Sequence, residues 1–132
     1  MTMRIMLLAP LALVACATTA DSRTESDAEM AKALQGKTAG TPVKCVPLTA
    51  LTGGPQVIDD RNILYRVSGR RIWRNTLPAS CPSLRPYSTI VVEVFGSELC
   101  RNDLIRPVTP GSGVPGPMCR LGDFTPYDKP KN

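Results

Sequence analysis

The cysteines constrain the fold of this chain more than any other feature. Its 132 residues contain five of them: Cys16 ends an apolar N-terminal stretch, and Cys45, Cys81, Cys100 and Cys119 are spread over the remainder. The last four form an even set, which predicts two disulfides if the chain is exported. The rival interpretation is a zinc site, which usually needs close-spaced ligand pairs. Because the chain has no C-x-x-C pair and no histidine, the sequence favours disulfides and predicts no metal.

The N-terminus has the parts of a secretory signal. Residues 1–4 carry the amino group and one arginine, and residues 5–14 form an uncharged apolar run that contains Pro10. A membrane-spanning helix needs about 20 apolar residues, roughly twice this length. We therefore expect residues 1–15 to be a signal peptide and not a permanent membrane span.

The end of this signal, Leu13-Val-Ala-Cys16, resembles the lipobox of bacterial lipoproteins. The resemblance implies cleavage before Cys16, a diacylglyceryl group on its thiol and a further acyl chain on its amine. Two or more acyl chains hold a protein stably on a membrane, whereas one gives marginal binding. The expected partner is therefore a membrane, bound through the lipid on the periplasmic side of a Gram-negative envelope. In the enteric pattern an aspartate after the cysteine retains a lipoprotein in the inner membrane; Ala17 stands there, which favours the outer membrane.

Residues 16–42 are interpreted as the lipidated cysteine followed by a flexible tether, because small, hydroxylated and charged residues dominate them. A random coil of this length spans about 25–30 Å. The alternative is a short docking helix: Ser26 begins a sequence with capping-box spacing, Gly36 is a possible helix end, and Met30 and Leu34 lie four residues apart. We favour the frayed spacer.

Residues 43–126 are expected to form one mainly β domain, followed by a polar tail at 127–132. Two hairpins and a closing strand are predicted, in the segments 57–67, 70–77, 89–95, 98–108 and 118–124. The thirteen prolines suit loops and edge strands and oppose long helices. The expected architecture is a small antiparallel sheet that closes into a barrel or a sandwich.

Details of both hairpins can be tested against a structure. A two-residue turn at Ser68-Gly69 would place Tyr65 opposite Ile72, and a longer turn would shift this register. The run 89–95 is the strongest predicted strand, since nearly all its residues are β-branched or aromatic. An interruption is expected at 101–103 in the strand that follows.

The strand order suggests how the cysteines pair. In an up-and-down sheet, Cys81 lies at the end where the last strand begins, near Cys119. Cys100 lies near the opposite end, to which the segment holding Cys45 can return. We favour Cys45–Cys100 with Cys81–Cys119 among three possible pairings; the sequential pairing, Cys45–Cys81 with Cys100–Cys119, remains open.

The short sequence motifs around these cysteines resemble those of a domain-of-unknown-function family of small exported proteobacterial proteins, many of them lipoproteins. The similarity covers about 45–124 and includes Cys45-Val-Pro-Leu48, Cys81-Pro-Ser-Leu84 and Leu99-Cys-Arg-Asn-Asp103. It implies no activity, substrate or catalytic residue. Asn102 stands where the family often has glycine, and both adopt left-handed turns. Asp103 is therefore interpreted as a turn or strand-cap residue.

The chain carries a formal net charge of +5, and its basic excess lies in the β domain. Arg70, Arg71, Trp73 and Arg74 are the first candidates for a binding surface, although a core position is favoured for Trp73. The expected partner is an envelope protein or an anionic envelope polymer. Nucleic acid is not expected, because aromatic residues do not alternate with the basic ones as in a base-stacking surface.

An enzyme would need acid–base or nucleophilic machinery. Without histidine, Ser-His-Asp and Cys-His arrangements are impossible. Carboxylate chemistry would need two of the following acidic residues: Asp59, Asp60, Glu93, Asp103 and Asp123. We predict a non-enzymatic lipoprotein with a binding or structural role, with no catalytic residues and no cofactor. The alternative is a hydrolase or lyase that uses two of these carboxylates on an envelope polymer.

Overall fold

The computed structural model describes residues 18–131, which fold into one α-helix, one 3₁₀ turn and ten short strands. In chain order they are α1 (Thr18–Leu34), β1 (Thr38–Ala39), β2 (Cys45–Pro47), η1 (Leu48–Ala50), β3 (Pro55–Val57), β4 (Asn62–Arg66), β5 (Arg71–Thr76), β6 (Thr89–Val92), β7 (Glu98–Cys100), β8 (Leu104–Val108), β9 (Cys119–Arg120) and β10 (Phe124–Asp128). Within this part of the chain no helix is both long enough and apolar enough to span a membrane.

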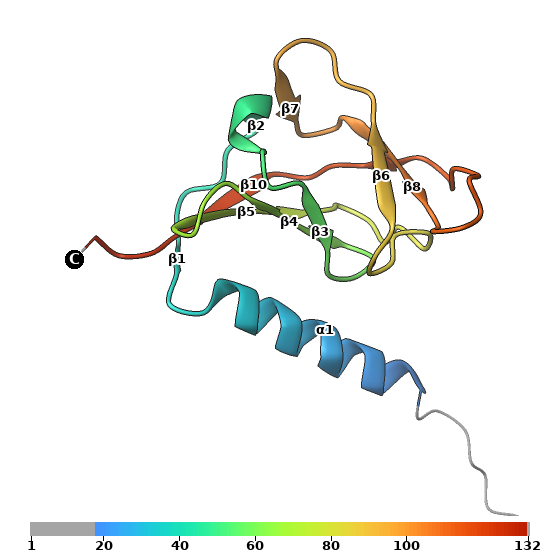
Figure 1. Cartoon of the computed structure of the whole chain (residues 1–132), viewed down its shortest axis with the longest axis horizontal. Helices are drawn as coiled ribbons and strands as arrows, with labels where there is room; N and C mark the ends of the chain where they lie inside the picture. The colour runs from blue at the N-terminus through green and yellow to red at the C-terminus, as the bar shows by residue number, and fades with distance from the viewer. Residues whose placement is uncertain (1–17, 132) are drawn as a thin grey trace, which may run out of the picture.

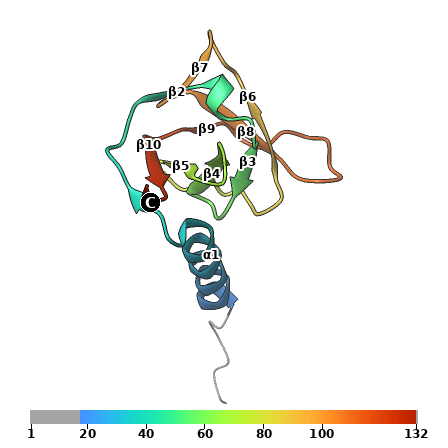
Figure 2. The ribbon, with the colours of Figure 1, turned by 60° about the vertical axis from the view of Figure 1, so that its left-hand side comes forward.

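The strands form three antiparallel sheets. The largest has the order β1-β10-β5-β4-β3, a second pairs β2 with β7, and a third has the order β6-β8-β9. In Figures 1 and 2, α1 lies on one side of the five-stranded sheet and the two smaller sheets lie on the other. The described strands do not close into a barrel. The mainly β, antiparallel prediction is confirmed, and of its two alternatives the layers match a sandwich.

The first predicted hairpin is β4–β5, with a register shifted by one residue. Tyr65 lies opposite Trp73 and not opposite Ile72. The cause is a three-residue turn, in which the Ser68 hydroxyl accepts the backbone N–H of Arg71 at 3.3 Å. Side chains of directly opposed residues point to the same face of a sheet, so a shift of one residue changes which side chains share a face. The rings of Tyr65 and Trp73 therefore lie on the same face.

The second predicted hairpin is only partly correct. β6 pairs with β8, with Thr89 opposite Val108, but it ends at Val92. β7 does not pair with β6; it pairs with β2, far away in sequence. The prediction that the strand continues to Phe95 is wrong: this ring is 89% exposed. The β propensity of residues 89–95 therefore predicts a strand longer than the one that pairs with β8.

The expected interruption between β7 and β8 is confirmed. Asn102 has a φ of 75°, in the left-handed region that favours glycine and asparagine. A carboxylate oxygen of Asp103 accepts the backbone N–H of Cys100 at 2.7 Å. Asp103 is thus a turn residue, as its position beside Asn102 predicts.

The main core lies between the five-stranded sheet and the two smaller sheets. Its buried residues are Val46, Val57, Ile63, Tyr65, Trp73, Leu77, Cys81, Leu84, Leu99, Ile105, Leu121 and Phe124. One buried polar side chain, Asn75, bonds both backbone groups of Gly122, donating to its carbonyl at 2.8 Å and accepting its N–H at 2.9 Å. This pair of hydrogen bonds joins β5 to the segment between β9 and β10.

Both favoured disulfides are present. Cys45–Cys100 joins directly opposed residues of β2 and β7, whose Cα atoms are 4.0 Å apart. Cys81–Cys119 joins the loop after β5 to β9, with Cα atoms 5.9 Å apart. The sequential pairing, Cys45–Cys81 with Cys100–Cys119, is therefore wrong.

The frayed spacer predicted for the tether is corrected by the structure from residue 18 onward. α1 runs from Thr18 to Leu34 and is not started by Ser26, which lies inside it. Met30, Ala33 and Leu34 form a second apolar cluster with Ile58, Leu64 and Ile72 on the outer face of the sheet. Gly36, with a φ of 70°, follows the helix as predicted. The docking-helix alternative is the one that the structure has.

The folded unit also extends beyond the predicted boundaries of 43 and 126. β1 pairs with β10 through Thr38 and Asp128. Tyr127 and Asp128, expected in a polar tail, lie opposite Ile72 and Arg71 in β10. Backbone pairing with β5 and β1, and not side-chain hydrophobicity, carries β10 past Pro126. Cys16 and the predicted signal peptide, residues 1–15, lie outside the described residues.

Candidate functional site

The four residues predicted as a binding surface do not form one patch. Arg71 makes a bidentate contact with the carboxylate of Asp128, with distances of 2.6 and 2.7 Å, and its guanidinium lies 5.4 Å from the ring centre of Trp73. The hydrogen bonds to Arg71 lower the pKa of the Asp128 carboxyl. Trp73 is buried in the main core, so the core position favoured for it is confirmed.

Arg74 lies on the opposite face of β5 from Trp73, because successive residues of a strand alternate. Its Nε and Nη2 donate to the Asn62 side-chain oxygen at 3.1 and 2.9 Å. Arg70 is exposed in the turn after β4, where it lines a shallow hollow with Gly36, Lys129 and Pro130. Arg70 is therefore the member of the set that remains available for an anionic group.

The candidate carboxylates are also separated by their local roles. Asp59 accepts the backbone N–H groups of Arg61 and Asn62, both at 2.7 Å, and closes the turn before β4 as predicted. Asp60 accepts the hydroxyl of Ser80. Each of these carboxylates is thus committed to holding a loop.

The other three candidates are equally separated. Asp103 caps its turn, and Asp123 pairs with Arg101 at 3.3 Å. Glu93 is exposed beyond the end of β6. Asp59 and Asp60 do line the same hollow, but each accepts hydrogen bonds that hold its loop.

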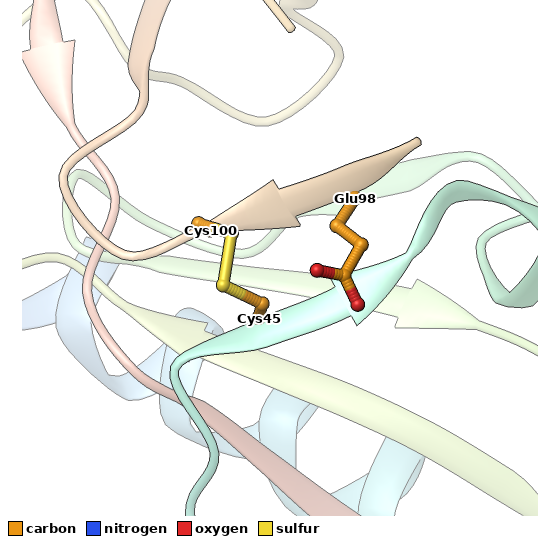
Figure 3. A group of neighbouring side chains, drawn as sticks. All are labelled: Cys45, Glu98 and Cys100. Carbon is orange, nitrogen blue, oxygen red and sulfur yellow. A yellow bond between two sulfur atoms is a disulfide. The ribbon is translucent and has the colours of Figure 1, made fainter. Parts of the chain in front are cut away.

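One group of side chains among residues 18–131 has the spacing of a metal site. The sulfur atoms of Cys45 and Cys100 and a carboxylate oxygen of Glu98 lie within 4.8 Å of one another. Figure 3 shows the two sulfurs joined in the disulfide, with the Glu98 side chain beside it. A cysteine binds metal as a thiolate, so the disulfide removes two of the three ligands.

Two buried polar atoms have no hydrogen-bond partner among the described residues: the Tyr65 hydroxyl and the Trp73 indole nitrogen. Burial raises the pKa of the Tyr65 hydroxyl. The two residues face each other across β4 and β5, inside the main core and away from the solvent. Neither residue lines the two hollows described in this section, and their place in the main core makes them relevant to stability.

A groove of about 790 Å³ lies between α1 and the β domain. Its walls come from residues 22–29 of α1, from residues 58–62 and from the loop 80–87; we call it the α1 groove. It contains three arginines and five carboxylates, namely Arg23, Arg61, Arg85, Glu25, Asp27, Glu29, Asp59 and Asp60. Both signs of charge therefore line the same surface.

At one side of the α1 groove, Tyr87 is 91% exposed and has a φ of 70°. It occupies the third position of the turn Arg85-Pro86-Tyr87-Ser88, which the Ser88 N–H closes on the Arg85 carbonyl at 3.0 Å. Proline second and a positive φ third are the requirements of a type II turn, whose third residue is usually glycine or asparagine. The sequence analysis missed this residue, and the proline before a large aromatic residue was the available signal.

Comparison with known proteins gives a family and no activity. Residues 1–131 match a family described as a family of unknown function, DUF6491. No curated protein and no solved structure matches the chain.

Proposed function

Because this chain belongs to the DUF6491 family, whose function is unknown, we propose its role from its own residues. It is a non-enzymatic lipoprotein of the bacterial envelope, and the lipid on Cys16 holds it on the periplasmic side of a membrane. We favour the outer membrane over the inner one. The disulfide-linked β domain acts by binding or by structural support. Its partner is an envelope protein or an anionic envelope polymer.

One observation carries this proposal: the chain is already helical at Thr18, the first residue that the structure describes, which lies two positions after Cys16. The same helix packs on the five-stranded sheet through Met30, Ala33 and Leu34. A lipid on Cys16 would therefore be coupled to the β domain through a helix of about 25 Å, given a rise of 1.5 Å per residue. Two disulfides within residues 45–119 also favour an oxidising compartment.

The anchor is tested with a Cys16→Ser variant of the full-length protein, expressed in a Gram-negative host. We expect the wild-type protein in the membrane fraction with acyl chains on Cys16, and the variant as an uncleaved precursor without lipid. Mass spectrometry of the purified chains distinguishes the two forms. Normal processing and membrane attachment of the variant would refute the anchor.

The binding role is supported by the hollow that contains Arg70 and Lys129. The Lys129 N–H donates to the Arg70 carbonyl at 2.9 Å, which keeps the two backbones adjacent and both cationic side chains on one surface. Asp128, the neighbouring acid, is already paired with Arg71. An anionic polymer would meet two cations here that make no ion pair within the described residues.

This role is tested by crosslinking in intact envelopes, with Arg70→Glu as the variant. Arg120→Glu is the matched control, since Arg120 is also exposed and makes no ion pair within residues 18–131. We expect crosslinked products that the Arg70 variant loses and the Arg120 variant retains. Equal loss in both variants would indicate a general charge effect, and no loss in either would place the binding surface elsewhere.

A further inference from the structure

The N-terminal part of α1 and the loop 80–87 lie on the same side of the molecule. Both line the α1 groove, with Ser22 and Arg23 of the helix on one wall and Arg85 and Tyr87 of the loop on the other. Thr18, the first described residue of α1, lies at this end of the helix and two positions after Cys16. Two residues span at most about 7 Å, so a lipid on Cys16 would keep this end of the helix close to the headgroups.

Tyr87 is a large ring in a conformation that disfavours it. The turn that contains it is closed and holds the residue at a positive φ, where a side chain with a Cβ is strained. Almost the whole ring faces solvent, so packing within the domain does not compensate for this strain. Such strain at an exposed residue indicates a role outside the fold.

The chemistry of the α1 groove matches one kind of surface. Tyrosine is enriched at the level of lipid headgroups, where its ring is partly buried and its hydroxyl stays hydrated. Asp59, Asp60, Glu29 and Arg61 of the groove hold neighbouring segments. Arg23, Arg85, Glu25 and Asp27, which also line it, complement a headgroup that carries both a phosphate and an ammonium group. A surface of purely negative charge would meet the excess of carboxylates and be repelled.

We propose that the loop 80–87 and the N-terminal part of α1 form a membrane-contact surface, on which Tyr87 enters the headgroup layer of a zwitterionic phospholipid bilayer. The inference rests on the proposed lipid anchor and adds an orientation to it. The β domain lies against the membrane with this side, and the connection between β6 and β7 points away. That connection lies on the side of the domain remote from α1 in Figures 1 and 2.

Phe95 supplies the matched control, because it belongs to that remote connection and is 89% exposed, against 91% for Tyr87. The lipidated full-length protein is reconstituted into phosphatidylcholine and phosphatidylethanolamine vesicles with brominated acyl chains, which quench nearby tryptophan. Tyr87→Trp is compared with Phe95→Trp. The emission of the wild-type protein, which comes from the buried Trp73, is subtracted from that of each variant to give the emission of the added tryptophan. We expect brominated lipid to reduce the added emission in the Tyr87 variant and to leave that of the Phe95 variant unchanged.

Equal quenching at both positions, or none at position 87, would overturn the orientation. The anchor is checked in the same sample by flotation: failure to float with the vesicles would refute the lipid anchor, whereas flotation without quenching would refute only the contact surface. Vesicles rich in anionic lipid should give weaker quenching at position 87. Stronger quenching there would refute the zwitterionic assignment.

A second variant separates membrane contact from a structural role of the ring. Tyr87→Gly removes the ring and suits the positive φ, so we expect its thermal midpoint to be unchanged or higher. A lower midpoint would mean that the ring serves the fold and would overturn the proposal.

Discussion

The inner face of the five-stranded sheet packs against two smaller sheets, whereas its outer face packs against a single helix. Twelve buried residues belong to the inner core, and one of them is Cys81 of the Cys81–Cys119 disulfide. The outer cluster has four buried residues, Ala33, Ile58, Leu64 and Ile72. Hydrophobic stabilisation follows the apolar area that is buried, so the inner core supplies most of the stability and the outer cluster mainly fixes where α1 lies.

This difference separates two tasks. We expect the sandwich to remain folded when α1 is displaced, because the disulfides and the Asn75–Gly122 hydrogen bonds lie in the sandwich and none of them involves α1. The helix, which leads to the proposed anchor, orients the domain through a small contact. Five predictions test this division, from the largest expected effect to the smallest.

Removing the Cys81–Cys119 disulfide should have the largest effect. The double variant Cys81→Ala/Cys119→Ala is expected to lose about 2–5 kcal/mol of unfolding free energy. Urea denaturation measures the loss, and Cys45→Ala/Cys100→Ala is the comparison. The two closed loops, of 38 and 55 residues, differ by only about 0.3 kcal/mol in closure entropy. The difference in burial should therefore decide which double variant loses more unfolding free energy. A greater loss after removal of the half-buried Cys45–Cys100 disulfide would contradict this expectation.

Asn75→Ala should cost on the order of 2–3 kcal/mol. The change leaves the buried N–H and carbonyl of Gly122 without their partners, and a stranded buried group costs about 1–3 kcal/mol. The comparison variant is Asn62→Ala, on the outer face of the sheet. Asn102→Ala is unsuitable because Asn102 has a positive φ. A smaller loss for Asn75→Ala than for Asn62→Ala would show that the inner network is not the stronger one.

Ala33→Asp should displace α1 at a cost of roughly 1–2 kcal/mol, since it places a charge in the small outer cluster. Hydrogen exchange should show faster exchange in α1 with little change in β4 and β5. Ala31→Asp, at an exposed position of the same helix, should change neither. Global unfolding in the Ala33 variant would mean that the helix is part of the main core.

Tyr65→Phe should be neutral or stabilise the domain by up to about 1 kcal/mol, because it removes a buried hydroxyl that has no partner within the described structure. The folded state raises the pKa of this hydroxyl. The wild-type protein should therefore lose stability as the pH rises above the ordinary tyrosine value of about 10, and the variant should lose less. Denaturation curves at pH 7 and above pH 10 make the comparison; equal alkaline losses would contradict it.

Asp128→Asn should have the smallest effect, below about 1 kcal/mol, because both partners of the Arg71–Asp128 pair are exposed. The pKa of Asp128 is lowered in the folded state. Its contribution is thus present above the unfolded value of about 4 and is lost as the pH falls through the folded value. Wild type and variant should differ at pH 7 in low salt and converge in acid or in high salt. A difference that persists in acid would point to packing and not to charge.

The sequence predicted those parts of the fold that depend on covalent or local chemistry. The formation of two disulfides, the turn at Asn102-Asp103 and the Asp59 turn follow from residue type and spacing, whereas the pairing of the cysteines was inferred from an assumed strand order. The partner of β7 and the extension of β10 past Pro126 could not be predicted, because they depend on pairing between segments far apart in sequence.

The candidate surface was harder to predict than the fold. Arg70, Arg71, Trp73 and Arg74 are adjacent in sequence, but alternation along β5 and the register of the turn distribute them over two faces and a core. The α1 groove combines three distant segments, so its composition has no continuous sequence signature. Only the Pro86-Tyr87 pair offered a local signal.

The most direct test of the account is the mass of the mature chain extracted from membranes, alkylated with and without reductant. We predict a chain that begins at Cys16, carries a diacylglyceryl group and a further acyl chain, and takes up alkylating reagent at four cysteines only after reduction. A mature chain that begins elsewhere, carries no lipid or has free thiols before reduction would contradict it.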